Sequence, residues 1–123
     1  MIRLIAADMD GTLLNSRKEL PEELPQLLLR LKRENIRFVV ASGRQYQNLL
    51  AQFPGMEGDI TFLSENGSMI FEKGKPIFLE PMERPAWMGL VSALRQIPGA
   101  CPILCGAKTA YYESTEPEFL ENA

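Results

Sequence analysis

Residues 2–12, IRLIAADMDGT, place Asp8 and Asp10 directly after a short, mainly apolar run. A short run of this kind predicts a strand over 2–7 that is buried on both faces of a parallel sheet. Two carboxylates one residue apart at a strand end are costly unless positive charge balances them. A magnesium ion would supply that charge, because it prefers hard oxygen ligands and leaves positions open for a phosphate. One carboxylate could then attack phosphorus while the other transfers a proton.

Two other interpretations of this segment stay open at this point. The first is an acidic loop at a strand end with no chemical role. The second is a calcium loop, since Asp8, Asp10, Thr12 and Glu19 fall at loop positions 1, 3, 5 and 12. A calcium loop needs glycine at position 6, where Leu13 stands, and it follows a helix rather than the predicted strand.

Outward from this segment, strand and helix patterns alternate. Leucines recur at helical spacing over 24–31, with Pro21 or Pro25 in the first turn and Asn35 as a left-handed stop. A second apolar run at 36–41 predicts a strand, a helix follows to about residue 53, and 60–63 predicts a third strand. This β-α-β-α-β order is typical of an α/β fold with a doubly wound parallel sheet. The carboxyl ends of its strands meet at one edge, so Asp8 and Ser42 should lie there.

Ser42 and Gly43 precede the second predicted helix, whose free N–H groups favour an anion. The alternative is that Ser42 only caps that helix. Arg44 could steer a phosphate or pair with an acidic residue. Asn66-Gly67, after the third strand, is also the favoured pair for a two-residue hairpin turn.

The pattern changes after residue 63. The stretches 68–72 and 76–80 flank Lys73-Gly74-Lys75 and predict a hairpin, and Glu80-Pro81 is an expected boundary. A helix over 83–97 should pack a stripe of apolar residues into a core, and 103–106 and 109–112 predict two short strands. The stripe consists of Trp87, Leu90, Val91 and Leu94. Tyr111 and Tyr112 could pack in the second strand or line a substrate mouth.

Composition narrows the function classes. The chain has 123 residues, 46% of them hydrophobic, and a net charge of −3, which does not indicate a nucleic-acid partner. There is no histidine, so Ser/His and Cys/His catalysis are excluded. Cys101 and Cys105 in one strand would be about 13 Å apart, too far for a disulfide. The apolar N-terminus is too short for a signal peptide, and no run is long enough to cross a membrane, so a cytoplasmic location is expected.

These motifs carry a family resemblance. MIRLIAADMDGTLLNS resembles the first motif of the haloacid-dehalogenase-like (HAD) superfamily phosphatases, and FVVASGR at 38–44 resembles the second. The chain is most similar to the Cof-like branch (subclass IIB), in which Glu65-Asn66-Gly67 is also a common segment. The resemblance implies a Rossmann-like (HAD-like) parallel sheet core over 1–81 and the beginning of an α+β cap domain over 82–123.

The resemblance also implies a reaction and its residues. Asp8 would be the nucleophile that forms an aspartyl-phosphate, and Asp10 would protonate the leaving alcohol and then activate water. The Asp8 carboxylate and the Asp10 carbonyl would bind Mg²⁺. Thr12 would orient the loop, while the remaining phosphate contacts would come from Ser42, Gly43 and Arg44. The implied substrate is a small phosphorylated metabolite, a phosphate monoester. The alternative is a non-catalytic domain that binds phosphate or a partner.

The family pattern includes a third motif with a lysine and a fourth with acidic residues, which would lie beyond residue 123. Thr115 and Glu118 form a capping-box pattern that predicts a helix close to the end of the chain. We therefore expect an N-terminal fragment that is inactive alone and self-associates through an uncovered sheet edge.

Overall fold

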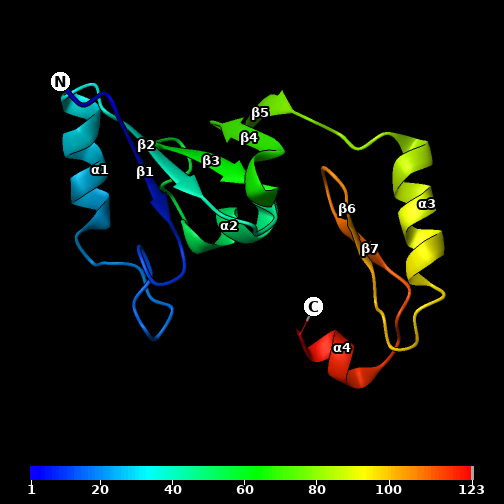
Figure 1. The fold of residues 1–123 in the computed structure, drawn as a ribbon. Coiled ribbons are helices and arrows are strands. Elements are labelled where there is room, and N and C mark those ends of the chain that lie inside the picture. Colours follow the sequence, from blue (N-terminus) through cyan, green and yellow to red (C-terminus); the bar gives the residue numbers. More distant parts are fainter. Residues whose placement is uncertain (123) are drawn as a thin grey trace. The chain divides into compact units, whose positions relative to one another are not determined.

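A computed structural model describes residues 1–122, and the chain divides into two compact units, Met1–Glu80 and Pro81–Ala123 (Figure 1). The elements of the first unit are β1 Leu4–Asp8, α1 Leu24–Arg33, β2 Arg37–Ala41, α2 Tyr46–Gln52, β3 Ile60–Ser64, a 3₁₀ turn Glu65–Gly67, β4 Met69–Glu72 and β5 Lys75–Leu79. Those of the second are α3 Arg84–Leu94, β6 Ile103–Cys105, β7 Ala110–Tyr112 and α4 Pro117–Asn122.

The first unit is built on one sheet with the strand order β1-β2-β3-β4-β5. Strands β1, β2 and β3 are parallel, which confirms the predicted β-α-β-α-β pattern. Their register places Asp8 beside Ala41, and Ala41 beside Leu63, so the carboxyl ends of all three strands meet at one edge. β4 and β5 extend the sheet as the predicted antiparallel hairpin, with Lys73 and Gly74 at positive φ in its turn.

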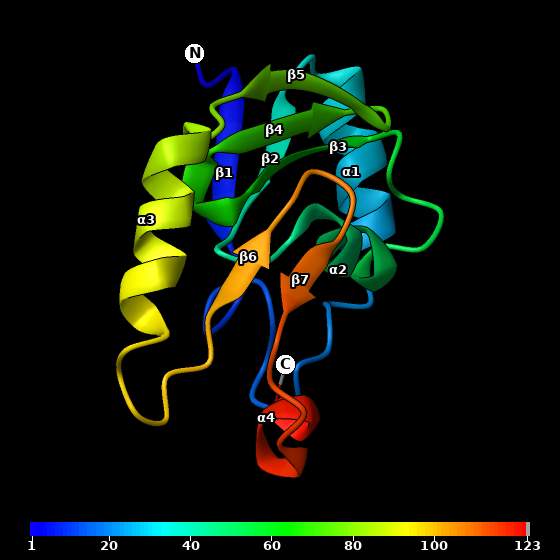
Figure 2. The ribbon, with the colours of Figure 1, turned by 90° about the vertical axis from the view of Figure 1, so that its right-hand side faces the viewer.

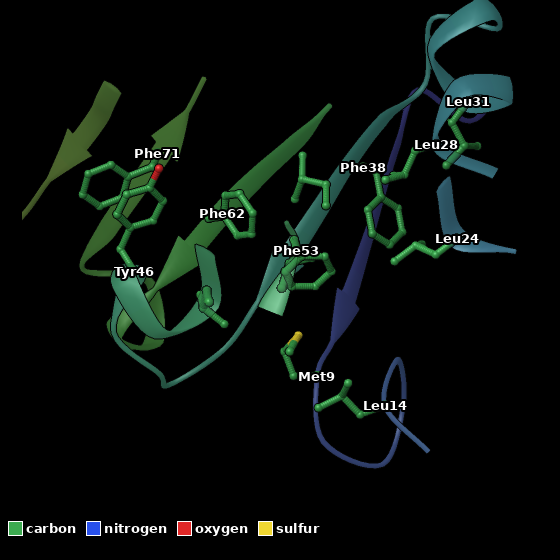
Figure 3. Packing of buried hydrophobic residues seen from close by; sticks show 13 residues of the cluster. Met9, Leu14, Leu24, Leu28, Leu31, Phe38, Tyr46, Phe53, Phe62 and Phe71 are labelled. Carbon is green, nitrogen blue, oxygen red and sulfur yellow. The ribbon is translucent and has the colours of Figure 1, made fainter. Parts of the chain in front are cut away.

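Helices α1 and α2 cover the same face of this sheet, as Figure 2 shows. Their buried side chains form one cluster with those of β2, β3 and β4. In Figure 3, Leu28 and Leu31 of α1 lie beside Phe38 of β2, while Tyr46 stacks on Phe71 with ring centroids 3.7 Å apart. This cluster fixes the ends of the strands that carry the candidate site.

The first helix begins and ends as the sequence predicts. Pro25, rather than Pro21, lies in the first turn of α1, where its missing N–H costs nothing. The helix stops before Asn35, whose φ of 54° is left-handed, and Asn35 N–H bonds to the carbonyl of Lys32. Arg30 lies with other basic residues in the last turn, which suits the helix dipole.

The prediction that the first strand is buried on both faces is wrong. Among the described residues, β1 forms one edge of the sheet and pairs only with β2, and Leu4 is 53% exposed. The apolar run still forms a parallel strand, but α1 packs mainly against β2. Within residues 1–122, β1 therefore has a free backbone edge and apolar side chains exposed beside it.

The second unit combines α3, the antiparallel pair β6 and β7, and α4. The predicted core stripe on α3 is not buried: none of its residues is buried, and Leu90 is 53% exposed. Trp87 and Val91 instead line a small cavity of about 140 Å³ that also includes residues of β6 and β7. Tyr111 and Tyr112 are both exposed, so strand packing does not bury them. Cys101 and Cys105 are not joined by a disulfide, as the sequence predicts.

Candidate active site

The loop after β1 is anchored by a buried methionine between two exposed aspartates. Met9 is fully buried, whereas Asp8 and Asp10 on either side of it are exposed. The carbonyl of Met9 accepts the N–H groups of Leu13 and Leu14, at 3.1 and 2.8 Å. The Met9 N–H donates to Asp8 Oδ1 at 2.8 Å. The core thus fixes the middle of the turn and directs both carboxylates to the carboxyl edge of the sheet. A strand before this loop excludes the calcium-loop interpretation.

Asp10 is held by two cations from different segments. Lys18 Nζ donates to Asp10 Oδ1 at 2.5 Å, and Arg44 Nη2 lies 3.0 and 3.1 Å from the two carboxylate oxygens. Lys18 follows in the same loop, while Arg44 comes from the segment after β2. The hydrogen bond from Lys18 lowers the pKa of Asp10 below its usual value, desolvation opposes this, and the bond and charge of Arg44 lower it further. Asp10 is therefore a carboxylate at neutral pH.

The segment after β2 carries the second motif. Ser42 N–H donates to the carbonyl of Leu63 at 2.9 Å, which continues the ladder between β2 and β3 past the last residue of β2. Arg44 N–H donates to Ser42 Oγ at 3.2 Å. Helix α2 begins at Tyr46 and Ser42 is not its cap, so the capping interpretation is wrong. The Ser42 hydroxyl accepts the Arg44 N–H in a local turn, and α2 begins three residues later than it would if Ser42 were its cap.

A turn after β3 packs against this segment. Glu65 N–H donates to the carbonyl of Arg44 at 3.1 Å, and Asn66 N–H donates to the carbonyl of Ser42 at 3.2 Å. Strands β3 and β4 form an antiparallel hairpin, and residues 65–68 connect them. The prediction of a two-residue turn at Asn66-Gly67 is therefore wrong, because the connection is longer than two residues. In the 3₁₀ turn found here, Glu65 and Asn66 adopt left-handed φ values of 50° and 55° rather than the negative φ of a regular 3₁₀ helix.

The residues that the sequence predicts for the site lie on the loops that follow β1, β2 and β3, and some of them are in direct contact while others are not. Arg44 and Asp10, 34 residues apart in sequence, are in direct contact. Thr12 is exposed in the first loop, and Gly43 is exposed in the second. Sequence reasoning missed Lys18, because a lysine in a polar loop carries no spacing signal. Its contact depends on a reversal of the chain at Asn15, whose side-chain oxygen accepts the N–H groups of residues 17 and 19.

The oxygen atoms at this edge fit part of a magnesium site. The Asp10 carboxylate binds Lys18 and Arg44, so the Asp8 carboxylate is the acidic side chain that could bind a metal ion at the end of β1. Within the described part of the chain, no cluster of three or more His, Cys, Asp or Glu side chains is arranged to hold a metal ion. Carboxylate and carbonyl oxygens are suitable ligands for Mg²⁺, and this ion usually retains several waters.

No helix among residues 1–122 is both long enough and apolar enough to cross a lipid bilayer.

Comparison with known proteins defines the class. The family model for haloacid dehalogenase-like hydrolases matches residues 5–122, so the chain belongs to this family. It is 39% identical over 111 residues to the 5-amino-6-(5-phospho-D-ribitylamino)uracil phosphatase YbjI of Escherichia coli, an alignment covering 89% of this chain and 41% of that protein. It is also 34% identical over 71 residues to the phosphatase YwpJ of Bacillus subtilis, covering 58% of this chain and 25% of YwpJ. The predicted resemblance to the haloacid-dehalogenase-like superfamily is thus confirmed, and both of these relatives are named as phosphatases.

Solved structures agree on the fold. The protein SMU.1108c of Streptococcus mutans superposes with a TM-score of 0.87 at 30% identity, over 99% of this chain and 47% of that one. A haloacid dehalogenase-like hydrolase of B. subtilis gives a TM-score of 0.82 at 26% identity, over 98% of this chain and 42% of that one. The chain thus has the Rossmann-like HAD fold, and it spans less than half the length of these relatives.

Proposed function

We propose that the complete protein containing these residues is a Mg²⁺-dependent phosphatase for small phosphorylated metabolites, with Asp8 as the nucleophile. The observation that carries this proposal is the meeting of the Asp8–Asp10 loop and the Ser42–Arg44 segment at one sheet edge, joined by the Arg44–Asp10 ion pair. A carboxylate beside backbone N–H groups and a guanidinium is a suitable arrangement for phosphoryl transfer. Membership in a hydrolase family with phosphatase relatives supports the same reaction class.

In the proposed reaction, an Asp8 carboxylate oxygen forms a bond to phosphorus as the bond from phosphorus to the ester oxygen breaks. Asp10, protonated in the substrate complex, gives its proton to the departing alkoxide, which leaves as an alcohol. Asp10 then takes a proton from water as that water attacks phosphorus and releases phosphate from Asp8. Ser42 and Gly43 would hold the phosphoryl oxygens through the hydroxyl and a backbone N–H, and Thr12 would keep the first loop in place.

The proposed metal ligands are the carboxylate of Asp8 and the backbone carbonyl of Asp10. Mg²⁺ would neutralise part of the charge on the phosphoryl oxygens. Arg44 would supply part of the same compensation, because a guanidinium binds phosphate as well as carboxylate.

A non-catalytic domain that binds phosphate or a partner is the second candidate, since the fold alone does not define function. Turnover of p-nitrophenyl phosphate by the complete protein separates the two. The compound in the name of the E. coli relative is the first specific substrate to assay. Phosphate binding without hydrolysis would favour the non-catalytic domain. The cytoplasmic location and the absence of nucleic-acid and membrane partners stay predictions.

We further propose that the 123-residue chain alone hydrolyses phosphate esters hardly at all. Within the described part of the chain, no group of three or more His, Cys, Asp or Glu side chains is placed to hold a metal ion, so this chain should bind Mg²⁺ weakly. Assays of this chain and of the complete protein under the same conditions, with Mg²⁺, test the difference. Equal turnover by both would contradict this part of the proposal.

A further inference from the structure

The turn after β3 and the segment after β2 form one hydrogen-bonded unit. Ser42 is held on both sides, because its N–H donates to the carbonyl of Leu63 and its carbonyl accepts the N–H of Asn66. The carbonyl of Arg44 accepts the N–H of Glu65. The backbone of the proposed phosphate-binding segment is therefore fixed by main-chain bonds to β3 and to the turn that follows it.

The side chain of Asn66 lies directly against Gly43. A Cβ atom placed on Gly43 would be 2.9 Å from Asn66 Oδ1 and 3.2 Å from Nδ2. An oxygen at 2.9 Å is closer than atoms approach a real Cβ, so a side chain at position 43 would force the Asn66 amide to shift from this position. The φ of Gly43 is not left-handed, and glycine is therefore needed here for space rather than for backbone conformation.

The turn adopts an unfavourable backbone to place Asn66 there. Asparagine tolerates the left-handed region, but Glu65 has the same sign of φ without that advantage, so its backbone is strained. The junction also leaves Gln45 Nε2 and Glu65 Oε1 buried without a hydrogen-bond partner among the described residues. Strained backbone and unpaired polar atoms are concentrated at functional sites, where water or a ligand completes the hydrogen bonds.

We propose that Asn66 is a positioning residue for phosphate binding, a role that rests on the function proposed above. Its backbone N–H holds Ser42, and its side-chain amide packs against Gly43, so together they fix the peptide between Ser42 and Gly43. The backbone N–H of Gly43 is then already ordered for the anion, so phosphate binding does not have to offset the entropy cost of ordering it. Asn66 acts through Gly43 rather than on the reacting atoms.

The test combines Asn66→Gly, Gly43→Ala and the double variant in the ¹⁵N-labelled complete protein, titrated with inorganic phosphate in the presence of Mg²⁺. Asn66→Gly keeps a residue that accepts the left-handed backbone and removes only the amide side chain. Gly58→Ala is the matched control, because an added Cβ at Gly58 meets no atom within 4 Å and its φ is not left-handed. The readouts are the phosphate affinity, from the shifts of the Ser42 and Gly43 amide resonances, and thermal unfolding.

Asn66→Gly and Gly43→Ala should each weaken phosphate binding about tenfold, the value of one hydrogen bond to a charged group. Gly43→Ala should lower the unfolding temperature in the wild-type background and have little effect in the Asn66→Gly background. Gly58→Ala should leave phosphate affinity unchanged. Wild-type affinity in Asn66→Gly, or an equal effect of Gly43→Ala in both backgrounds, would overturn the inference.

Failure of the proposed function would give a different result. In that case phosphate would shift neither the Ser42 nor the Gly43 amide of the wild-type complete protein, and the phosphate role of Asn66 would be overturned with it. The unfolding experiment would still show whether Asn66 holds Gly43 in place. The two failures are therefore distinguishable.

Discussion

Arg44 Nη2 lies 3.0 Å from Oδ1 and 3.1 Å from Oδ2 of Asp10 and so connects the loop after β1 to the segment after β2. The pair matters because Asp10, as the proposed general acid, must carry a proton when the ester bond breaks. Arg44 and Lys18 both favour the charged carboxylate in the free chain. A bound phosphoryl group, being an anion, would compete for these cations and favour the protonated acid.

Replacement of Arg44 by alanine should raise the pKa of Asp10 toward its usual value, because one hydrogen-bond donor and one positive charge are lost. Arg17→Ala is the control, since Arg17 pairs with Glu19 in the same loop. NMR titration of the Asp10 carboxyl carbon measures both. Because folding lowers this pKa, the stabilisation is present at neutral pH and is lost as the pH falls through the folded-state value. An Asp10 titration that does not change in Arg44→Ala would show that the ion pair is absent in solution.

Neighbouring leucines of α1 should differ sharply in their effect on stability. Leu28→Ala should cost about 2–5 kcal/mol, since Leu28 is only 2% exposed and packs in the core. Leu29→Ala, at a position 51% exposed, should change the free energy of unfolding by about 0.5 kcal/mol or less. Urea denaturation of both variants provides the comparison. Similar losses in the two would mean that α1 does not face the sheet as described.

The free edge of β1 should make the 123-residue chain self-associate. Unpaired backbone groups beside the exposed side chain of Leu4 are a template for another strand. Leu4→Lys should reduce association, because an edge lysine opposes strand pairing. Sedimentation over a range of concentrations measures the effect, with Leu29→Ala as a control for general loss of exposed apolar surface. A monodisperse wild-type monomer at all concentrations would contradict this expectation.

Sequence reasoning succeeded where local patterns determine the structure. The order of strands and helices follows from apolar runs, and the position of Asn35 at the end of α1 follows from its tolerance of left-handed φ. The burial of β1 was predicted wrongly, because an apolar run does not reveal which neighbours cover it. The contacts of Asn66 with Gly43 and of Lys18 with Asp10 depend on how turns fold back, and no spacing in the sequence encodes them.

The complete protein should require Mg²⁺, and Ca²⁺ should not replace it. The proposed ligands are all oxygen atoms, and the larger, looser coordination of Ca²⁺ would spoil the in-line arrangement of nucleophile and leaving group. Hydrolysis of p-nitrophenyl phosphate with each ion after chelator treatment is the measurement. Equal turnover with Ca²⁺ alone would contradict the proposed requirement for Mg²⁺.

The most direct test of the central claim is to trap phosphate on Asp8. The complete protein is mixed with Mg²⁺ and a phosphate ester, quenched, reduced with borohydride and digested for mass spectrometry. Borohydride converts an aspartyl-phosphate to homoserine, and the account predicts this change at position 8. Asp8→Asn should show no reduction there and should lose activity about a hundredfold or more. Reduction at another residue, or near-normal activity of Asp8→Asn, would contradict the account.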